Sequence, residues 1–273
     1  MNLKILISFM LLSHTVFTFA SDDKIDLCTK GGEESGNGLG RDEIPPYCYD
    51  LFKKSAGLEA IKTSANGKVF AFGYNNIIFN KQDGIVRTIA GSNAQLSEVI
   101  ALGIDEANHE IAVLDKTGDV LIFPSRMSGN IAPYRILKHK DLYGASDLMI
   151  NAKKNEVIVF NNSKQSLIFF PRLANNHGRE KKKTPSVLRV IRNLTGIGSV
   201  SLDESHQELF MLDTVKNRIN VVSLENVSHS LTSVRSLALP SSFKNARKIE
   251  YSIGKDQIIV TNAGGETVAI FRN

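Results

Sequence analysis

The chain has 273 residues, with 33 Lys and Arg against 28 Asp and Glu, and a formal net charge of +5. Most of the excess positive charge lies between Arg172 and Lys183, and the rest of the chain is close to neutral. This distribution disfavours a nucleic-acid-binding protein, which usually presents a broad cationic surface. The two cysteines form neither a Cys-x-x-Cys motif nor a metal-ligand spacing, which makes redox catalysis improbable.

The first twenty residues have the pattern of a signal peptide. Residues 5–12 form an apolar run, and Thr18-Phe19-Ala20 supplies the small residues of a cleavage site. The run is too short to span a bilayer, which takes about 20 apolar residues; an uncleaved anchor is the alternative. We therefore predict cleavage after Ala20 and a periplasmic or secreted chain from Ser21, with no later segment apolar enough to cross a membrane.

Residues 21–57 differ in composition from the rest of the mature chain and predict an N-terminal arm. Five glycines lie between residues 30 and 40, but no strand precedes them and no helix follows, so a dinucleotide-binding loop is excluded. In an oxidising compartment we expect a disulfide between Cys28 and Cys48, which would stabilise the fold by about 3 kcal/mol. Two unpaired thiols are the alternative.

Residues 58–273 repeat one pattern of four short β-strands. The clearest unit, residues 100–139, has short apolar strands separated by turns rich in Asn, Asp, Gly and Lys. The first strands of the five units end at equivalent positions, which follow one another at intervals of 41, 46, 52 and 51 residues: Ser64, Asp105, Asn151, Asp203 and Gly254. This period predicts an all-β fold, a β-propeller of about five four-stranded blades. A β-sandwich is the alternative architecture.

The last unit has three strands before the chain ends. Propellers commonly complete such a blade with a strand from the other terminus, which removes two open sheet edges. Residues 47–52 are the most apolar part of the arm, and we predict that they supply the strand that closes the ring. Six blades would require further strands within residues 21–57.

One repeat is similar to a known family. Residues 108–113 and 120–123, and above all Gly129-Asn130-Ile131-Ala132-Pro133, resemble the repeat of bacterial exported propellers of the NHL-repeat and lactonase-like (YVTN-type) families. The resemblance is strong over about 40 residues and diffuse over the other units. It implies a propeller fold and, for most exported members, binding without catalysis. Lactonase-like members hold a divalent metal in the channel, and their ligand set cannot be assembled in this sequence.

The candidate site residues have structural interpretations beside the functional ones. Asp residues at strand ends accept hydrogen bonds from the amides of their own turns, which explains Asp105, Asp115, Asp203 and Asp213 without catalysis or metal binding. His109 and His206 occupy the same first turn in their blades, so a repeat position explains them better than catalysis. Neither catalytic residues nor a metal or other cofactor is predicted. The cations Arg172, Arg179, Lys181, Lys182 and Lys183 form either a solvated loop or a loop that attracts an anionic partner.

The sequence therefore favours a non-enzymatic, monomeric scaffold that binds a protein or glycan partner in the cell envelope or outside the cell. The competing interpretation is a metal-dependent, lactonase-like or lyase-like propeller enzyme, and a third is a structural member of an envelope complex.

Overall fold

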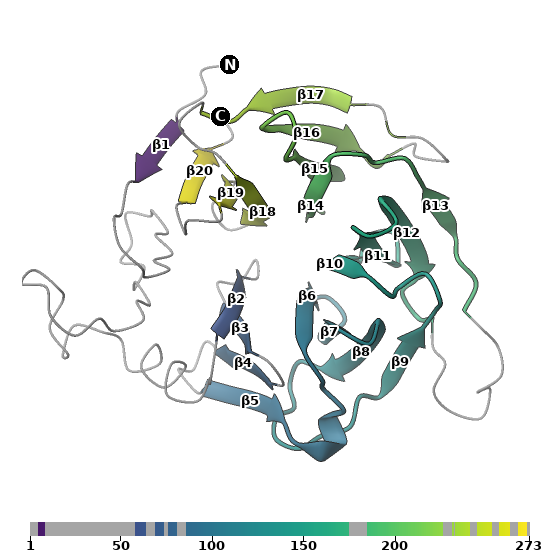
Figure 1. Ribbon diagram of the computed structural model, residues 1–273. Helices are drawn as coiled ribbons and strands as arrows, with labels where there is room; N and C mark the ends of the chain where they lie inside the picture. Colours follow the sequence, from purple (N-terminus) through teal and green to yellow (C-terminus); the bar gives the residue numbers. More distant parts are fainter. Residues whose placement is uncertain are drawn as a thin grey trace, which may run out of the picture.

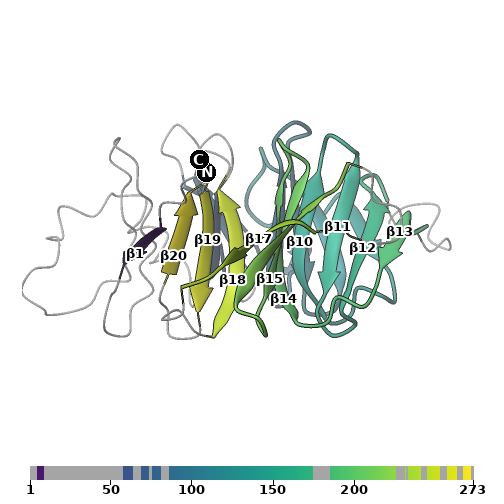
Figure 2. The ribbon, with the colours of Figure 1, turned by 90° about the horizontal axis from the view of Figure 1, so that it is seen from above.

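The computed structural model describes residues 5–8, 58–63, 69–73, 76–80, 86–174, 185–225, 231, 233–240, 245–252, 257–262 and 267–271. Five four-stranded antiparallel sheets stand around a common centre (Figure 1). In the side view the strands of each sheet run along the axis of this arrangement (Figure 2). The prediction of a β-propeller with four-stranded blades is confirmed.

The blades follow one another in chain order. The first blade contains β2 (Leu58–Thr63), β3 (Val69–Gly73), β4 (Asn76–Asn80) and β5 (Val86–Ala90), and the 3-10 turn η1 (Ser92–Ala94) follows. The second contains β6 (Val99–Asp105), β7 (Glu110–Asp115), β8 (Asp119–Pro124) and β9 (Arg135–Lys138). The third contains β10 (Ala145–Asn151), β11 (Glu156–Asn161), β12 (Ser166–Pro171) and β13 (Arg189–Ile191). The fourth contains β14 (Ile197–Asp203), β15 (Glu208–Asp213), β16 (Arg218–Ser223) and β17 (Ser233–Ala238).

The fifth blade combines both ends of the chain. Three consecutive strands, β18 (Ala246–Ser252), β19 (Gln257–Asn262) and β20 (Thr267–Phe271), are joined by β1 (Ile5–Ser8), which pairs antiparallel with β20. The sequence predicted residues 47–52 for this place, and these lie outside the described residues, as do Cys28 and Cys48. In the described part of the chain, no helix is long and apolar enough to cross a membrane.

In the second, third and fourth blades both faces of the sheet are buried, because each face packs against a neighbouring blade. Along β11, Val157 and Val159 pack toward the second blade, while Ile158 and Phe160 pack toward the fourth. Strands that are apolar on both faces, such as β11, are thereby explained: their side chains alternate between two interblade cores. Gly103 permits the close approach, since a Cβ there would lie 3.0 Å from the Ile150 side chain.

The first strand of every blade contains the same irregularity. The register with the second strand shifts by one residue near the start of β2, β6, β10, β14 and β18. The residues after the shift are therefore equivalent around the ring: Ala60, Ala101, Asp147, Ser199 and Lys248. The first strands are innermost (Figure 1), so this position recurs at one level of the innermost strands.

The predicted turn interactions are confirmed. Asp105 Oδ1 accepts a hydrogen bond from the Asn108 amide at 2.9 Å, and Asp203 Oδ1 accepts one from the His206 amide at 3.2 Å. At the ends of second strands, Asp115 and Asp213 accept hydrogen bonds from the amides of their own turns in the same way. These carboxylates take the place of a backbone acceptor in tight turns.

Candidate functional site

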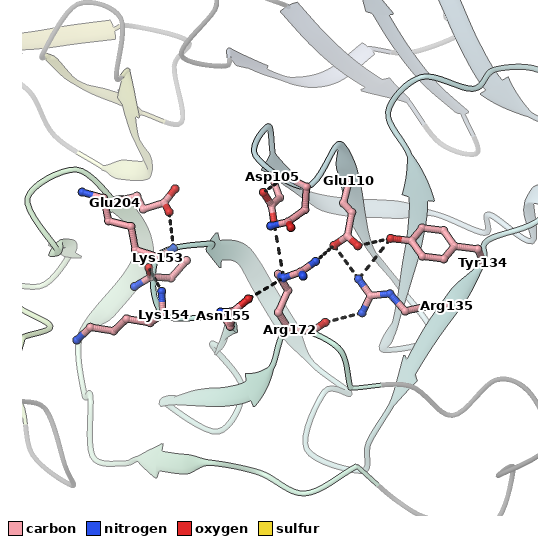
Figure 3. A network of polar contacts seen from close by, with 11 residues as sticks. Asp105, Glu110, Tyr134, Arg135, Lys153, Lys154, Asn155, Arg172 and Glu204 are labelled. Carbon is pink, nitrogen blue, oxygen red and sulfur yellow. Dashed lines mark hydrogen bonds and ion pairs between the residues drawn. The ribbon is translucent and has the colours of Figure 1, made fainter.

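Four buried charged side chains and two exposed polar ones lie between the second and third blades, and we call this group the charged seam: Asp105, Glu110, Arg135 and Arg172, with Tyr134 and Asn155 (Figure 3). Glu110, the first residue of β7, is its centre. Arg135 Nη2 lies 2.7 Å and Arg172 Nη1 lies 2.9 Å from Glu110 Oε2, and the Tyr134 hydroxyl donates a hydrogen bond to Glu110 Oε1. The side chains of Glu110, Arg135 and Arg172 are 8%, 9% and 10% exposed, so all three are desolvated.

Arg172 joins the two blades. Its backbone amide donates to the Asn155 carbonyl at 2.7 Å, and its Nε donates to Asn155 Oδ1 at 3.2 Å, which fixes it to the third blade. Its guanidinium then reaches Glu110 of the second blade, and Nε lies 3.8 Å from Asp105 Oδ2. Arg135 Nη1 donates back to the Arg172 carbonyl.

The placement of Arg172 separates it from the basic loop that the sequence predicted. Arg172 is buried and paired within the chain, so its charge does not belong to a solvent-facing cluster. Sequence proximity had grouped it with Arg179, Lys181, Lys182 and Lys183, which lie outside the described residues.

The contacts within the charged seam shift the pKa values of Glu110 and Tyr134. Burial acts to raise the pKa of Glu110, but the hydrogen bond from Tyr134, the charge of Arg135 and the hydrogen bonds from Arg172 and Arg135 outweigh it, and the pKa is lowered. Burial and the hydrogen bond to the Glu110 carboxylate raise the pKa of Tyr134. Glu110 is therefore held as a carboxylate, which suits a structural anion and opposes a role as a general acid near neutral pH.

This pairing predicts acid sensitivity. Because the pKa of Glu110 is depressed by folding, its contribution to stability is complete above its unfolded pKa and is lost as pH falls below about 4.3. We expect the difference in free energy of unfolding between wild type and Glu110→Gln to shrink from pH 6 to pH 3. Urea denaturation at several pH values measures this difference. A difference that is constant or grows on acidification contradicts the assignment.

The Glu–Arg pair recurs in successive blades. The first residue of the second strand pairs with an Arg of the fourth strand in the third blade, where Glu156 makes two bonds to Arg189 of 2.6 and 2.9 Å. In the fourth blade Arg235 Nη2 lies 2.9 Å from Glu208 Oε2. These pairs were not predicted, although the recurrence of Glu and Arg at fixed strand positions in the sequence was a usable signal.

An exposed apolar side chain precedes each of these arginines. Tyr134, Leu188 and Val234 are equivalent in register and are 43%, 50% and 62% exposed. All three lie at the start of the outermost strand of their blades, at the end of the blade opposite the turn between second and third strands. We call these three residues the apolar rim.

A second polar group joins the innermost strands of three blades. Asp147 Oδ1 accepts hydrogen bonds from Ser199 Oγ at 3.0 Å and from Lys248 Nζ at 2.9 Å. Ser199 Oγ and Ser201 Oγ accept hydrogen bonds from the amides of Ile249 and Tyr251, at 3.3 and 2.9 Å. These contacts join the first strands of the third, fourth and fifth blades, while the first two blades have alanine at the same level.

The buried charges are paired within the chain. Each buried Asp, Glu and Arg of the described residues makes a hydrogen bond or ion pair within the chain: Asp105, Glu110, Asp115, Arg135, Asp147, Glu156, Arg172, Asp203 and Asp213. Within the same part of the chain, no group of three His, Cys, Asp or Glu side chains is arranged to hold a metal ion.

The two histidines are also engaged locally, but they do not share a repeat position, since His109 directly precedes Glu110 whereas Gln207, not His206, directly precedes Glu208. His109 Nε2 lies 2.6 Å from Arg126 Nη2, and His206 Nδ1 lies 2.7 Å from Asp203 Oδ2. The residues directly before the paired glutamates, His109, Asn155 and Gln207, have positive φ values of 56°, 53° and 53°. The same turn conformation therefore places the glutamate in each of the three blades.

The fold and the paired interior define the chain as a β-propeller. Two solved structures are similar to it. The β-propeller domain of Cps50 (Swd1) from Myceliophteria thermophila is 9% identical, with 77% of this chain and 63% of that chain covered and a TM-score of 0.53. A chain of the mitotic checkpoint complex is 10% identical, with 79% of this chain and 77% of that chain covered and a TM-score of 0.54. The chain thus spans less than two thirds of the Cps50 structure.

No family model and no curated protein matches the chain. At 9–10% identity the structural likeness shows the fold alone. The resemblance to bacterial exported NHL-repeat or lactonase-like propellers stays a prediction.

Proposed function

We propose that the chain is a non-enzymatic propeller scaffold that binds a protein partner through the apolar rim. The observation that carries this proposal is the recurrence of a large exposed apolar side chain at one register position in three successive blades. Single exposed apolar residues are ordinary on protein surfaces and need no explanation. A repeated one, on the same edge of neighbouring blades, supplies several anchor points for one partner.

The rim is held rigidly, which favours binding. Each rim residue is followed by an arginine that is paired with a glutamate of the same blade: Arg135 with Glu110, Arg189 with Glu156 and Arg235 with Glu208. Arg189 also lies over the Phe169 ring, 3.8 Å from its centroid. A partner that packs on a rigid strand loses little additional conformational entropy, and burial of apolar surface drives most protein–protein association.

The predicted export of the chain and the cations after β12 add to the proposal. The signal-peptide pattern of residues 1–20 supports a periplasmic or secreted protein. Arg179, Lys181, Lys182 and Lys183 follow the third blade's β12 in sequence and would steer an acidic protein partner toward this edge of the ring, an effect that salt weakens over a Debye length of about 8 Å. An anionic glycan is the alternative ligand for these cations.

Replacing the rim residues tests the proposal. We expect Leu188→Gln with Val234→Gln to weaken capture of partners from the native envelope at least about tenfold, because two apolar anchors are lost. The matched control is Tyr143→Gln with Val215→Gln, which removes two apolar side chains of 73% and 78% exposure from the opposite end of the blades. Quantitative cross-linking before purification measures capture.

The two variants separate the possible outcomes. Loss with the rim variant and normal capture with the control supports the rim as the binding surface. Equal capture by wild type and the rim variant contradicts it.

A further inference from the structure

The fifth blade differs from the others in the origin of its outer strand. In the other four blades, four consecutive strands run from the innermost to the outermost position. In the fifth, β20 is paired with β1, in the register Ile5 with Ile270 through Ser8 with Thr267 (Figure 1). The free edge of β20 is therefore a strand-binding site that accepts a short antiparallel segment.

The segment in that site belongs to the predicted leader. Residues 5–8 lie within the apolar run that precedes the cleavage site at Ala20. Cleavage removes β1 and leaves the amides and carbonyls of β20 without a neighbour. An open edge of this kind pairs readily with another strand.

The lengths of the connections indicate which segment replaces β1. The connections from the outermost strand of one blade to the innermost strand of the next are residues 91–98, 139–144, 192–196 and 239–245, five to eight residues each. A strand over residues 47–52 would leave residues 53–57 before β2, which has the length of the shortest of these connections. From Ser8 to Leu58, by contrast, the chain runs through residues 9–57.

The residue before β2 supports the same assignment. In the third, fourth and fifth blades, the residue before the first strand has a positive φ: Gly144 at 83°, Gly196 at 88° and Asn245 at 57°. The equivalent residue of the first blade, by register, is Gly57. Glycine adopts this conformation without steric cost, so the sequence before β2 matches a normal connection from an outermost strand.

We propose that the β20 edge binds two segments of this chain in succession, residues 5–8 before leader cleavage and residues 47–52 after it. The proposal rests on the export proposed above, since only cleavage empties the edge. It gives the leader a second role: it occupies the last blade until it is removed, and the arm then takes its place.

The effect of proline in the arm should depend on the leader. In an edge strand every other amide donates to the neighbouring strand, and proline cannot donate, so Tyr49→Pro with Asp50→Pro removes one such amide in either register of residues 47–52. Under reducing conditions we expect this variant to lower the Tm of residues 21–273 by about 4 °C or more and that of residues 1–273 by less than about 1 °C. Gly36→Pro with Gly38→Pro, elsewhere in the arm, is the control and should leave both Tm values unchanged.

Equal shifts in the two chains, or no shift in residues 21–273, would overturn the proposal. If the variant of residues 21–273 does not fold, a synthetic peptide of residues 45–54 is added to residues 53–273. A rise in Tm with the wild-type peptide and none with the Tyr49→Pro, Asp50→Pro peptide supports the proposal, and no rise with either overturns it. N-terminal sequencing of the exported chain tests export separately, since a start at Met1 refutes cleavage while the melting data still decide what the edge binds.

Discussion

Replacing Glu110 with alanine is expected to lower the free energy of unfolding by about 3–5 kcal/mol. The change leaves the Arg135 and Arg172 guanidinium groups buried, at 9% and 10% side-chain exposure, without the carboxylate that both contact. The Tyr134 hydroxyl loses its acceptor at the same time. Urea denaturation followed by circular dichroism measures the loss, with the slope of the transition checked against wild type.

Glu208→Ala is the matched control, because Glu208 occupies the same register position in the fourth blade. Its pair with Arg235 is more exposed, with side chains 14% and 29% accessible, so water compensates for part of the loss. We expect a cost of about 1–2 kcal/mol, between that of a surface pair and that of a buried one. A loss for Glu110→Ala no greater than for Glu208→Ala would show that the charged seam does not join the blades.

Arg172→Met is expected to destabilise the protein by about 3 kcal/mol, although the sequence places Arg172 in a basic loop. Methionine keeps much of the side-chain volume but leaves Glu110 with one fewer cation and Asn155 Oδ1 without a donor. The effect is measured by the same urea titration.

The other four cations of the segment supply the control. Replacing Arg179, Lys181, Lys182 and Lys183 together with Gln should change the free energy of unfolding by no more than about 0.5 kcal/mol, as for ordinary surface substitutions. If Arg172→Met is as mild as this fourfold change, Arg172 belongs with the loop.

The strands were predictable because their signals are local. The sequence predicted second strands at residues 110–114, 156–160 and 208–212, and the structure has Glu110–Asp115, Glu156–Asn161 and Glu208–Asp213. Short β-branched runs between Asp, Asn and Gly turns specify such hairpins within a few residues of sequence. The last residue of each second strand, an Asp or Asn, pairs with the first strand and also begins the following turn. Each observed strand is therefore one residue longer than the predicted one.

The contacts of the candidate sites could not be predicted in the same way. Lys248 and Asp147 are 101 residues apart and meet because the register shift recurs in β10 and β18, a feature that strand patterns do not reveal. Arg172 likewise meets Glu110 only after the blades pack, since each side chain lies on a different sheet. Composition placed Arg172 among solvated cations, whereas interblade packing buries it.

The structural role of the seam is tested most directly by a double-mutant cycle on Glu110 and Arg172. The free energies of unfolding of wild type, Glu110→Ala, Arg172→Met and the double variant give the coupling between the two side chains. If the pair joins the second blade to the third, the double variant loses less than the sum of the single losses, by at least about 2 kcal/mol. Losses that add to within about 0.5 kcal/mol would contradict a buried pair that holds the blades together.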